Sequence, residues 1–104
     1  MIIQYNTDKT INGDERHEDF FKTEIAEGLS RFDSYLTRVE VHLKDENGKK
    51  EGLNDIHCLM EARIEGRQPV VVSNQAKSTK LAVSGAITKM QGVLKTVVEQ
   101  LKHH

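Results

Sequence analysis

Three side chains of the kinds that bind transition metals, His42, His57 and Cys58, lie in the middle of the chain. His57 and Cys58 are neighbours in a segment where apolar and polar residues alternate, which is the pattern of a half-buried strand. Adjacent side chains of a strand point to opposite faces, so these two cannot easily share one ion. The alternation places Cys58 in the core. We therefore expect no metal site and interpret the histidines as surface polar groups.

Nucleophilic catalysis would need Cys58 or a serine beside a base and an orienting acid. The cysteine is expected to be buried, and no nucleophile-elbow pattern occurs in the sequence. Adjacent acids such as Glu18 and Asp19 are interpreted as solubilising residues that complement a helix dipole. The isolated glycines are turn residues and do not form a phosphate-binding loop: Gly48, Gly52 and Gly66. We expect no catalytic residue, no cofactor and no small-molecule substrate.

Basic residues near the C-terminus could contact phosphate groups. On a helix that advances about 100° per residue, six of its residues fall within an arc of about 60°: Lys77, Lys80, Ser84, Gln91, Lys95 and Lys102. Amines and hydrogen-bonding groups along one ridge can follow a nucleic-acid backbone. The ridge has no arginine and no aromatic residue, so it suits electrostatic contact rather than base stacking. The alternative interpretation is an ordinary solvated face.

The charge of the chain is unevenly distributed. Net charge is −1, which does not by itself indicate a nucleic-acid-binding protein. Residues 1–34 carry eight acidic and four basic side chains, whereas residues 35–104 carry eight and eleven. From Gln68 onward the only acid is Glu99, against five lysines. Any basic surface is therefore expected on the C-terminal helix.

Length and composition indicate one domain, residues 1–104. The apolar fraction of 37% and the charged fraction of 30% exclude a wholly disordered chain. No apolar run approaches the roughly 20 residues of a membrane span, and the first residues lack the pattern of a secretory signal. A single cysteine fits a reducing compartment, so we expect a cytoplasmic protein with no membrane partner.

Four strands and two helices are predicted. The strands are Ile2–Asn6, Arg38–Lys44, Ile56–Glu65 and Pro69–Val72, with a polar loop at Asp45–Asp55. The first helix begins near Asp14–His17, and its apolar stripe runs through Phe21, Ile25, Gly28, Leu29, Phe32 and Leu36. Within that stripe Gly28 would allow close approach of the helix to the sheet, or would be a tolerated defect.

The second helix is expected from Ala76 to Leu101, with Ser73 or Asn74 as its N-cap. Its apolar stripe comprises Val83, Ala86, Ile87, Met90, Val93, Leu94, Val97 and Leu101. The economical α+β fold is a two-layer β-α-β-β-β-α sandwich, in which both helices pack on one face of a four-stranded sheet. The outer face would then be polar and mixed in sign, which suits cross-strand pairs better than phosphate contact.

The segment Arg38–Asn74 reads RVEVHLKDENGKKEGLNDIHCLMEARIEGRQPVVVSN. Its strand, charged loop, strand, turn and strand resemble the ribosome hibernation-promoting factors, also called ribosome-associated inhibitors or subunit-interface proteins. The resemblance is greatest to a short bacterial branch and covers nearly the whole chain. It implies the β-α-β-β-β-α fold without the additional C-terminal domain of long members.

The resemblance also implies a noncatalytic function. Such proteins bind the small ribosomal subunit in its decoding channel, contact ribosomal RNA and shut idle ribosomes down during stress or stationary phase. The leading RNA contacts expected here are Lys77, Lys80, Lys89 and Lys95, and the secondary ones are Lys49, Lys50 and Arg67. The alternative is an interaction or structural paralogue with reduced RNA affinity, which self-associates weakly through the sheet face or an edge strand.

Overall fold

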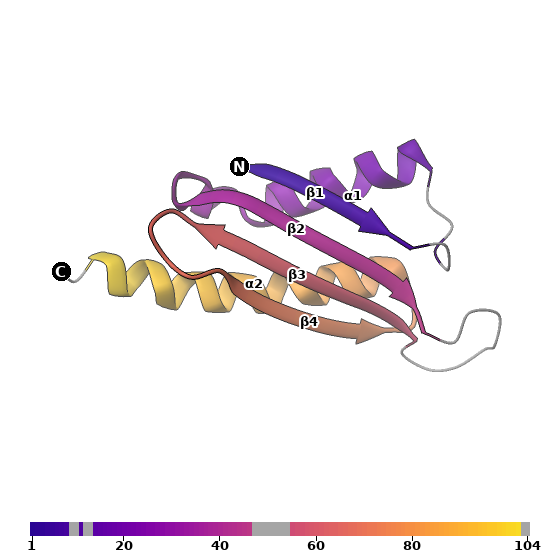
Figure 1. Cartoon of the computed structure of the whole chain (residues 1–104). Helices are drawn as coiled ribbons and strands as arrows, with labels where there is room; N and C mark the ends of the chain where they lie inside the picture. The colour runs from indigo at the N-terminus through magenta and orange to yellow at the C-terminus, as the bar shows by residue number, and fades with distance from the viewer. Residues whose placement is uncertain (9–10, 12–13, 47–54, 103–104) are drawn as a thin grey trace.

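A single sheet with strand order β1-β2-β3-β4 forms one layer of the protein (Figure 1). The computed structural model describes residues 1–8, 11, 14–46 and 55–102. Along these residues the elements follow in the order β1 (Ile2–Thr7), α1 (Glu15–Gly28), a 3-10 helix η1 (Ser30–Tyr35), β2 (Leu36–Asp45), β3 (Ile56–Ile64), β4 (Val70–Ala76) and α2 (Thr79–Lys102). The predicted β-α-β-β-β-α order is confirmed.

The register of the strands follows from the alternation in the sequence. β1 is parallel to β2 and is joined to it through α1, whereas β2–β3 and β3–β4 are antiparallel. Val41 of β2 pairs with Met60 of β3, and Leu43 pairs with Cys58. All four of these side chains are buried, so the apolar residues of both strands face the same layer.

Both helices cover one face of this sheet, behind it in Figure 1, as predicted. α1 packs mainly against β1, and α2 packs against β3 and β4. The core between the layers includes Phe32 and Met90, which are 4% and 0% exposed. Cys58 is fully buried in the same core, and burial raises the pKa of its thiol to about 12. The expected core positions of Cys58, Phe32 and Met90 are therefore confirmed.

The prediction of one continuous helix through Leu36 is wrong. α1 ends at Gly28, the chain continues as η1, and Leu36 is already the first residue of β2. The N–H of Leu29 still donates to the carbonyl of Ile25, but the N–H of Phe32 donates to the carbonyl of Leu29. Because this 3-10 turn keeps a three-residue spacing, the apolar stripe stays buried although the α-helix has ended.

Gly28 permits a close approach of α1 to α2, and not to the sheet as predicted. A Cβ atom at this position would lie 2.6 Å from Cγ2 of Ile87 on α2. In addition, Gln91 Nε2 of α2 donates a hydrogen bond of 2.7 Å to the Gly28 carbonyl. The glycine therefore fixes where the two helices meet, and it turns the side of α2 that carries Gln91 toward α1.

The start of α2 also differs from the prediction. β4 extends to Ala76, and the Ser78 hydroxyl accepts a hydrogen bond of 3.2 Å from the N–H of Leu81 in the first turn of α2. Ser73 and Asn74 are strand residues and do not cap the helix. Their alternating pattern could extend a strand as well as precede a helix, and strand pairing with β3 decided the outcome. Lys77 consequently lies in the β4–α2 connection.

None of the helices in the described residues is both long and apolar enough to cross a membrane. Likewise, within residues 1–8, 11, 14–46 and 55–102, no three His, Cys, Asp or Glu side chains are grouped so that they could hold a metal ion.

Candidate nucleic-acid interface

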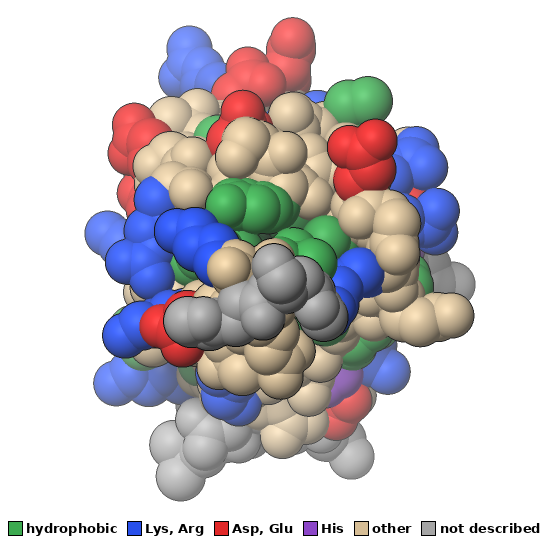
Figure 2. Space-filling view, turned by 90° about the vertical axis from the view of Figure 1, so that its left-hand side faces the viewer, with side chains coloured by type: hydrophobic (Ala, Val, Ile, Leu, Met, Phe, Trp, Pro, Cys, Tyr) green, Lys and Arg blue, Asp and Glu red, His purple; other side chains and the backbone are tan. Residues whose placement is uncertain are grey.

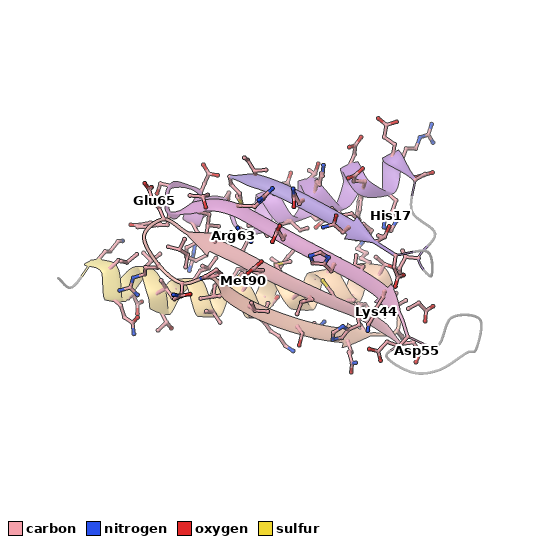
Figure 3. The ribbon with its side chains drawn as sticks, in the orientation of Figure 1. His17, Lys44, Asp55, Arg63, Glu65 and Met90 are labelled. Carbon is pink, nitrogen blue, oxygen red and sulfur yellow. The ribbon has the colours of Figure 1, made fainter. Side chains whose placement is uncertain are left out.

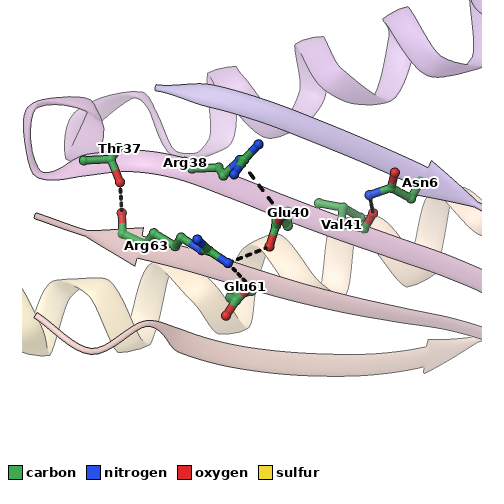
Figure 4. Close-up of polar contacts among 7 residues, drawn as sticks. All are labelled: Asn6, Thr37, Arg38, Glu40, Val41, Glu61 and Arg63. Carbon is green, nitrogen blue, oxygen red and sulfur yellow. Dashed lines mark hydrogen bonds and ion pairs between the residues drawn. The ribbon is translucent and has the colours of Figure 1, made fainter.

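The bases on the outer face of the sheet are occupied by ion pairs (Figure 4). Arg63 Nη2 lies 3.4 Å from Glu40 Oε2 and 3.9 Å from Glu61 Oε2. Arg38 Nε lies 4.0 Å from Glu40 Oε1. A hydrogen bond with Glu61 and the guanidinium groups of Arg63 and Arg38 lower the pKa of Glu40. The predicted mixed face is thus a cross-strand network that balances its own charge.

Two lysines outside α2, half-buried Lys22 and exposed Lys44, are paired in the same way. Lys22 Nζ lies 3.4 Å from Glu18 Oε1, one turn earlier on α1, and Lys44 Nζ lies 3.6 Å from Glu46 Oε1 at the end of β2. Such exposed pairs add little stability, but they reduce the positive potential of the surface that carries them.

The lysines of α2 are different. Lys80, Lys95 and Lys102 are exposed, and no acid of the described residues lies within ion-pair distance of them. Lys80 and Lys95 are separated by about 22 Å along the helix axis at 1.5 Å per residue. The Gln91–Gly28 hydrogen bond places this ridge on the side of α2 that faces α1. Exposed Lys77 lies just before the helix and is likewise unpaired among the described residues.

Lys89 does not lie with the other α2 lysines. Its Nζ donates a hydrogen bond of 2.7 Å to the backbone carbonyl of Ser73 in β4. β4 is an edge strand of the sheet, so this ammonium occupies a backbone carbonyl to which the N–H of another strand could otherwise donate. The structure therefore separates Lys89 from the ridge that contains Lys80 and Lys95.

The secondary candidates are only partly described. Arg67 is exposed in the β3–β4 turn, where Gly66 adopts φ of 75°, and its N–H donates to the Ile64 carbonyl at 3.1 Å. Its side chain borders a shallow apolar hollow with Val70 and with Val97 of α2. Lys49 and Lys50 lie outside the described residues.

Arg31 and Tyr35 were not among the contact residues expected from the sequence. Both line a hollow of about 510 Å³ between η1 and the last turns of α2, which we call the η1–α2 hollow. Its lining residues are Arg31, Phe32, Ser34, Tyr35, Lys95, Val98, Glu99 and Lys102. At this end of the molecule, Lys and Arg side chains gather along the middle of the left-hand side, next to exposed hydrophobic side chains (Figure 2). The sequence does place Arg31 beside the aromatic residues Phe32 and Tyr35, and this grouping could have indicated a nucleic-acid contact.

A different kind of hollow, of about 400 Å³, lies beside the start of α1. The Tyr5 hydroxyl is 2.7 Å from Nε2 of His17, which is labelled in Figure 3, and the Tyr5 ring stacks on Phe21. Burial is the main cause that raises the pKa of Tyr5, so its hydroxyl stays neutral. The rim carries the acids Asp14, Glu15 and Glu18. This surface repels phosphate, so α2 and η1 form the better candidate interface.

The sequence matches one known family. Residues 6–102 match the family described as Sigma 54 modulation protein / S30EA ribosomal protein. The match covers nearly the whole chain, and the chain belongs to this family of ribosome-associated proteins. No curated protein sequence matches the chain significantly.

Two solved structures share the fold. The N-terminal domain of Protein Y from Thermus thermophilus superimposes with a TM-score of 0.68 at 16% identity, over 93% of this chain and 99% of that one. A ribosomal subunit interface protein from Coxiella burnetii superimposes with a TM-score of 0.72 at 10% identity, over 95% of this chain and 99% of that one. At these identities the likeness concerns the fold, and the residues of the interface must be argued from this chain itself.

Proposed function

We propose that this protein binds the small ribosomal subunit through ribosomal RNA near the decoding channel and inhibits translation there. Such binding would silence idle ribosomes in the bacterial cytoplasm during stress or stationary phase, without chemistry. Membership of a ribosome-associated family supports the choice of partner. The proposed contacts are Lys77, Lys80, Lys95 and Lys102, with Arg67 at the same end of the molecule as the C-terminal turns of α2.

The observation that carries this proposal is the distribution of ion pairs. On the sheet face Arg38 and Arg63 are bound to carboxylates, whereas the α2 ridge has exposed cations without such partners among the described residues. Cations that are free of protein carboxylates can exchange their counterions for phosphates, which is the main source of nucleic-acid affinity. Lys89 is left out of the contact set because its ammonium already donates to Ser73.

The alternative, self-association through the sheet, finds less support in the contacts. The Glu40–Arg63 and Glu61–Arg63 pairs already satisfy the charged groups at the centre of the outer face. At the β4 edge, the Lys89–Ser73 hydrogen bond occupies one of the carbonyls that a second strand would need. Both features are typical of surfaces that remain solvated.

The proposal predicts that the wild-type protein sediments with purified small ribosomal subunits at low salt. The logarithm of the association constant should then fall linearly with the logarithm of salt concentration, with a slope of roughly −3 to −4 for about four lysine–phosphate contacts. Cosedimentation across a salt series measures this slope. Failure to sediment even at the lowest salt concentration would show that this chain does not bind the small ribosomal subunit.

A further inference from the structure

The η1–α2 hollow combines positive charge with aromatic surface, which the α2 ridge alone does not offer. Arg31 reaches it from η1, and Lys95 and Lys102 reach it from α2. Its volume of about 510 Å³ is within the range of about 300–1,000 Å³ that is typical of small-ligand sites. The hollow is therefore large enough for one nucleotide of a nucleic-acid chain.

The charge of the hollow favours a single phosphate group. Three cations face one carboxylate, that of Glu99, and none of the three is in an ion pair among the described residues. The C-terminal end of α2 carries partial negative charge, which attracts Lys102 and opposes an anion. A phosphate bound here would consequently depend on several cations together, and removal of Glu99 should strengthen its binding.

Aromatic groups fix the position of the guanidinium and line the hollow. The Arg31 Cζ atom lies 4.6 Å from the centre of the Phe32 ring, within the range of a cation–π contact. Tyr35 is partly exposed, and its backbone carbonyl accepts a hydrogen bond of 3.3 Å from the N–H of Glu65. Unpaired bases stack on guanidinium groups and on tyrosine rings.

We propose that the η1–α2 hollow binds one unpaired nucleotide of an RNA chain. The phosphate would lie among Arg31, Lys95 and Lys102, and the base would lie against Tyr35. This inference rests on the proposed function, because ribosomal RNA supplies the nucleotide. It adds a specific subsite to a surface that otherwise recognises only charge.

Tyrosine fluorescence tests the subsite directly, because the chain has no tryptophan and its two tyrosines are Tyr5 and Tyr35. The variant Tyr5→Phe retains a ring against Phe21 and leaves Tyr35 as the only emitter. Titration with a uridine hexanucleotide should quench this emission to saturation. The same titration of the wild-type protein, in which buried Tyr5 adds a constant background, keeps the test valid if the variant folds poorly.

One double variant and two single variants give the expected results for hexanucleotide binding. The double change Arg31→Gln and Lys102→Gln should weaken hexanucleotide binding by about tenfold or more, since charge-assisted contacts are lost. Glu99→Gln should tighten it by roughly threefold. Lys22→Gln, which removes a lysine of α1 that is paired with Glu18, should leave it unchanged. A melting temperature measured for each variant separates loss of binding from loss of the helix-dipole contribution of Lys102.

The remaining outcomes decide between the possible sources of phosphate. Inorganic phosphate should compete with the hexanucleotide without quenching Tyr35, and uridine monophosphate should bind at least about tenfold more weakly, because it lacks the neighbouring phosphates. Equal affinity for the mononucleotide would overturn the assignment to RNA. Absence of saturable quenching while the wild type still sediments with small subunits would overturn the subsite alone. Saturable quenching without cosedimentation would instead contradict the proposed ribosome binding.

Discussion

Replacement of Lys77, Lys80, Lys95 and Lys102 together by glutamine should abolish cosedimentation with small ribosomal subunits at moderate salt. Each lysine is exposed and unpaired among the described residues, so each is free to contact a phosphate. Loss of four such contacts should weaken binding by roughly a hundredfold or more. The slope of the logarithm of the association constant against the logarithm of salt concentration should become less negative by about three. Glutamine keeps much of the side-chain length and has good helix propensity, so the fold should persist.

A pair of double variants provides the matched control for this result. One variant combines Lys80→Gln with Lys95→Gln, and the other combines Lys22→Gln with Lys44→Gln. Each removes two ammonium groups, and only the second pair is already bound to carboxylates. The first double variant should lose most of the affinity, whereas the second should retain it. If both lose affinity equally, net charge and not the α2 surface determines binding.

The largest loss of stability is expected at the two buried positions where the helical layer meets the sheet. Phe32→Ala should lower the free energy of unfolding by roughly 3–5 kcal/mol and Met90→Ala by roughly 2–5 kcal/mol, because each leaves a cavity in a closed core. Phe32 is 4% exposed and Met90, labelled in Figure 3, is 0% exposed.

Urea denaturation of each variant measures these losses as a shift of the midpoint at constant slope. Phe32→Ala should also weaken hexanucleotide binding, since the Arg31 guanidinium packs on the Phe32 ring. Losses below about 1 kcal/mol at both positions would mean that the packing of η1 and α2 against the sheet is not as described.

The strands could be predicted from the sequence because β2 and β3 alternate so regularly. Pairs such as Leu43 with Cys58 follow once both apolar faces must be buried together. The ends of the helices could not be predicted as well. A three-residue spacing fits α- and 3-10 helices alike, so nothing in the apolar stripe revealed that α1 stops at Gly28. Similarly, only the pairing of β4 with β3 shows that Asn74 is a strand residue.

The candidate site was predictable where it depends on one helix and not where it depends on two elements. Helical spacing alone places Lys80, Lys95 and Lys102 on one ridge. The proximity of Arg31 to Lys102 depends on how η1 packs against α2, and the arginine and aromatic residues of the local sequence do not determine that packing. The same holds for Lys89, since its hydrogen bond to Ser73 exists only because β4 lies beside α2.

Acylation of lysine amines, with and without bound small subunits, shows whether the α2 lysines contact the ribosome. Mass spectrometry of the modified protein reports the reactivity of each ammonium separately. We expect strong protection of Lys80, Lys95 and Lys102 in the complex and unchanged reactivity of Lys22 and Lys44, which lie on other surfaces. Protection of Lys22 and Lys44 with continued reactivity of the α2 lysines would contradict this expectation.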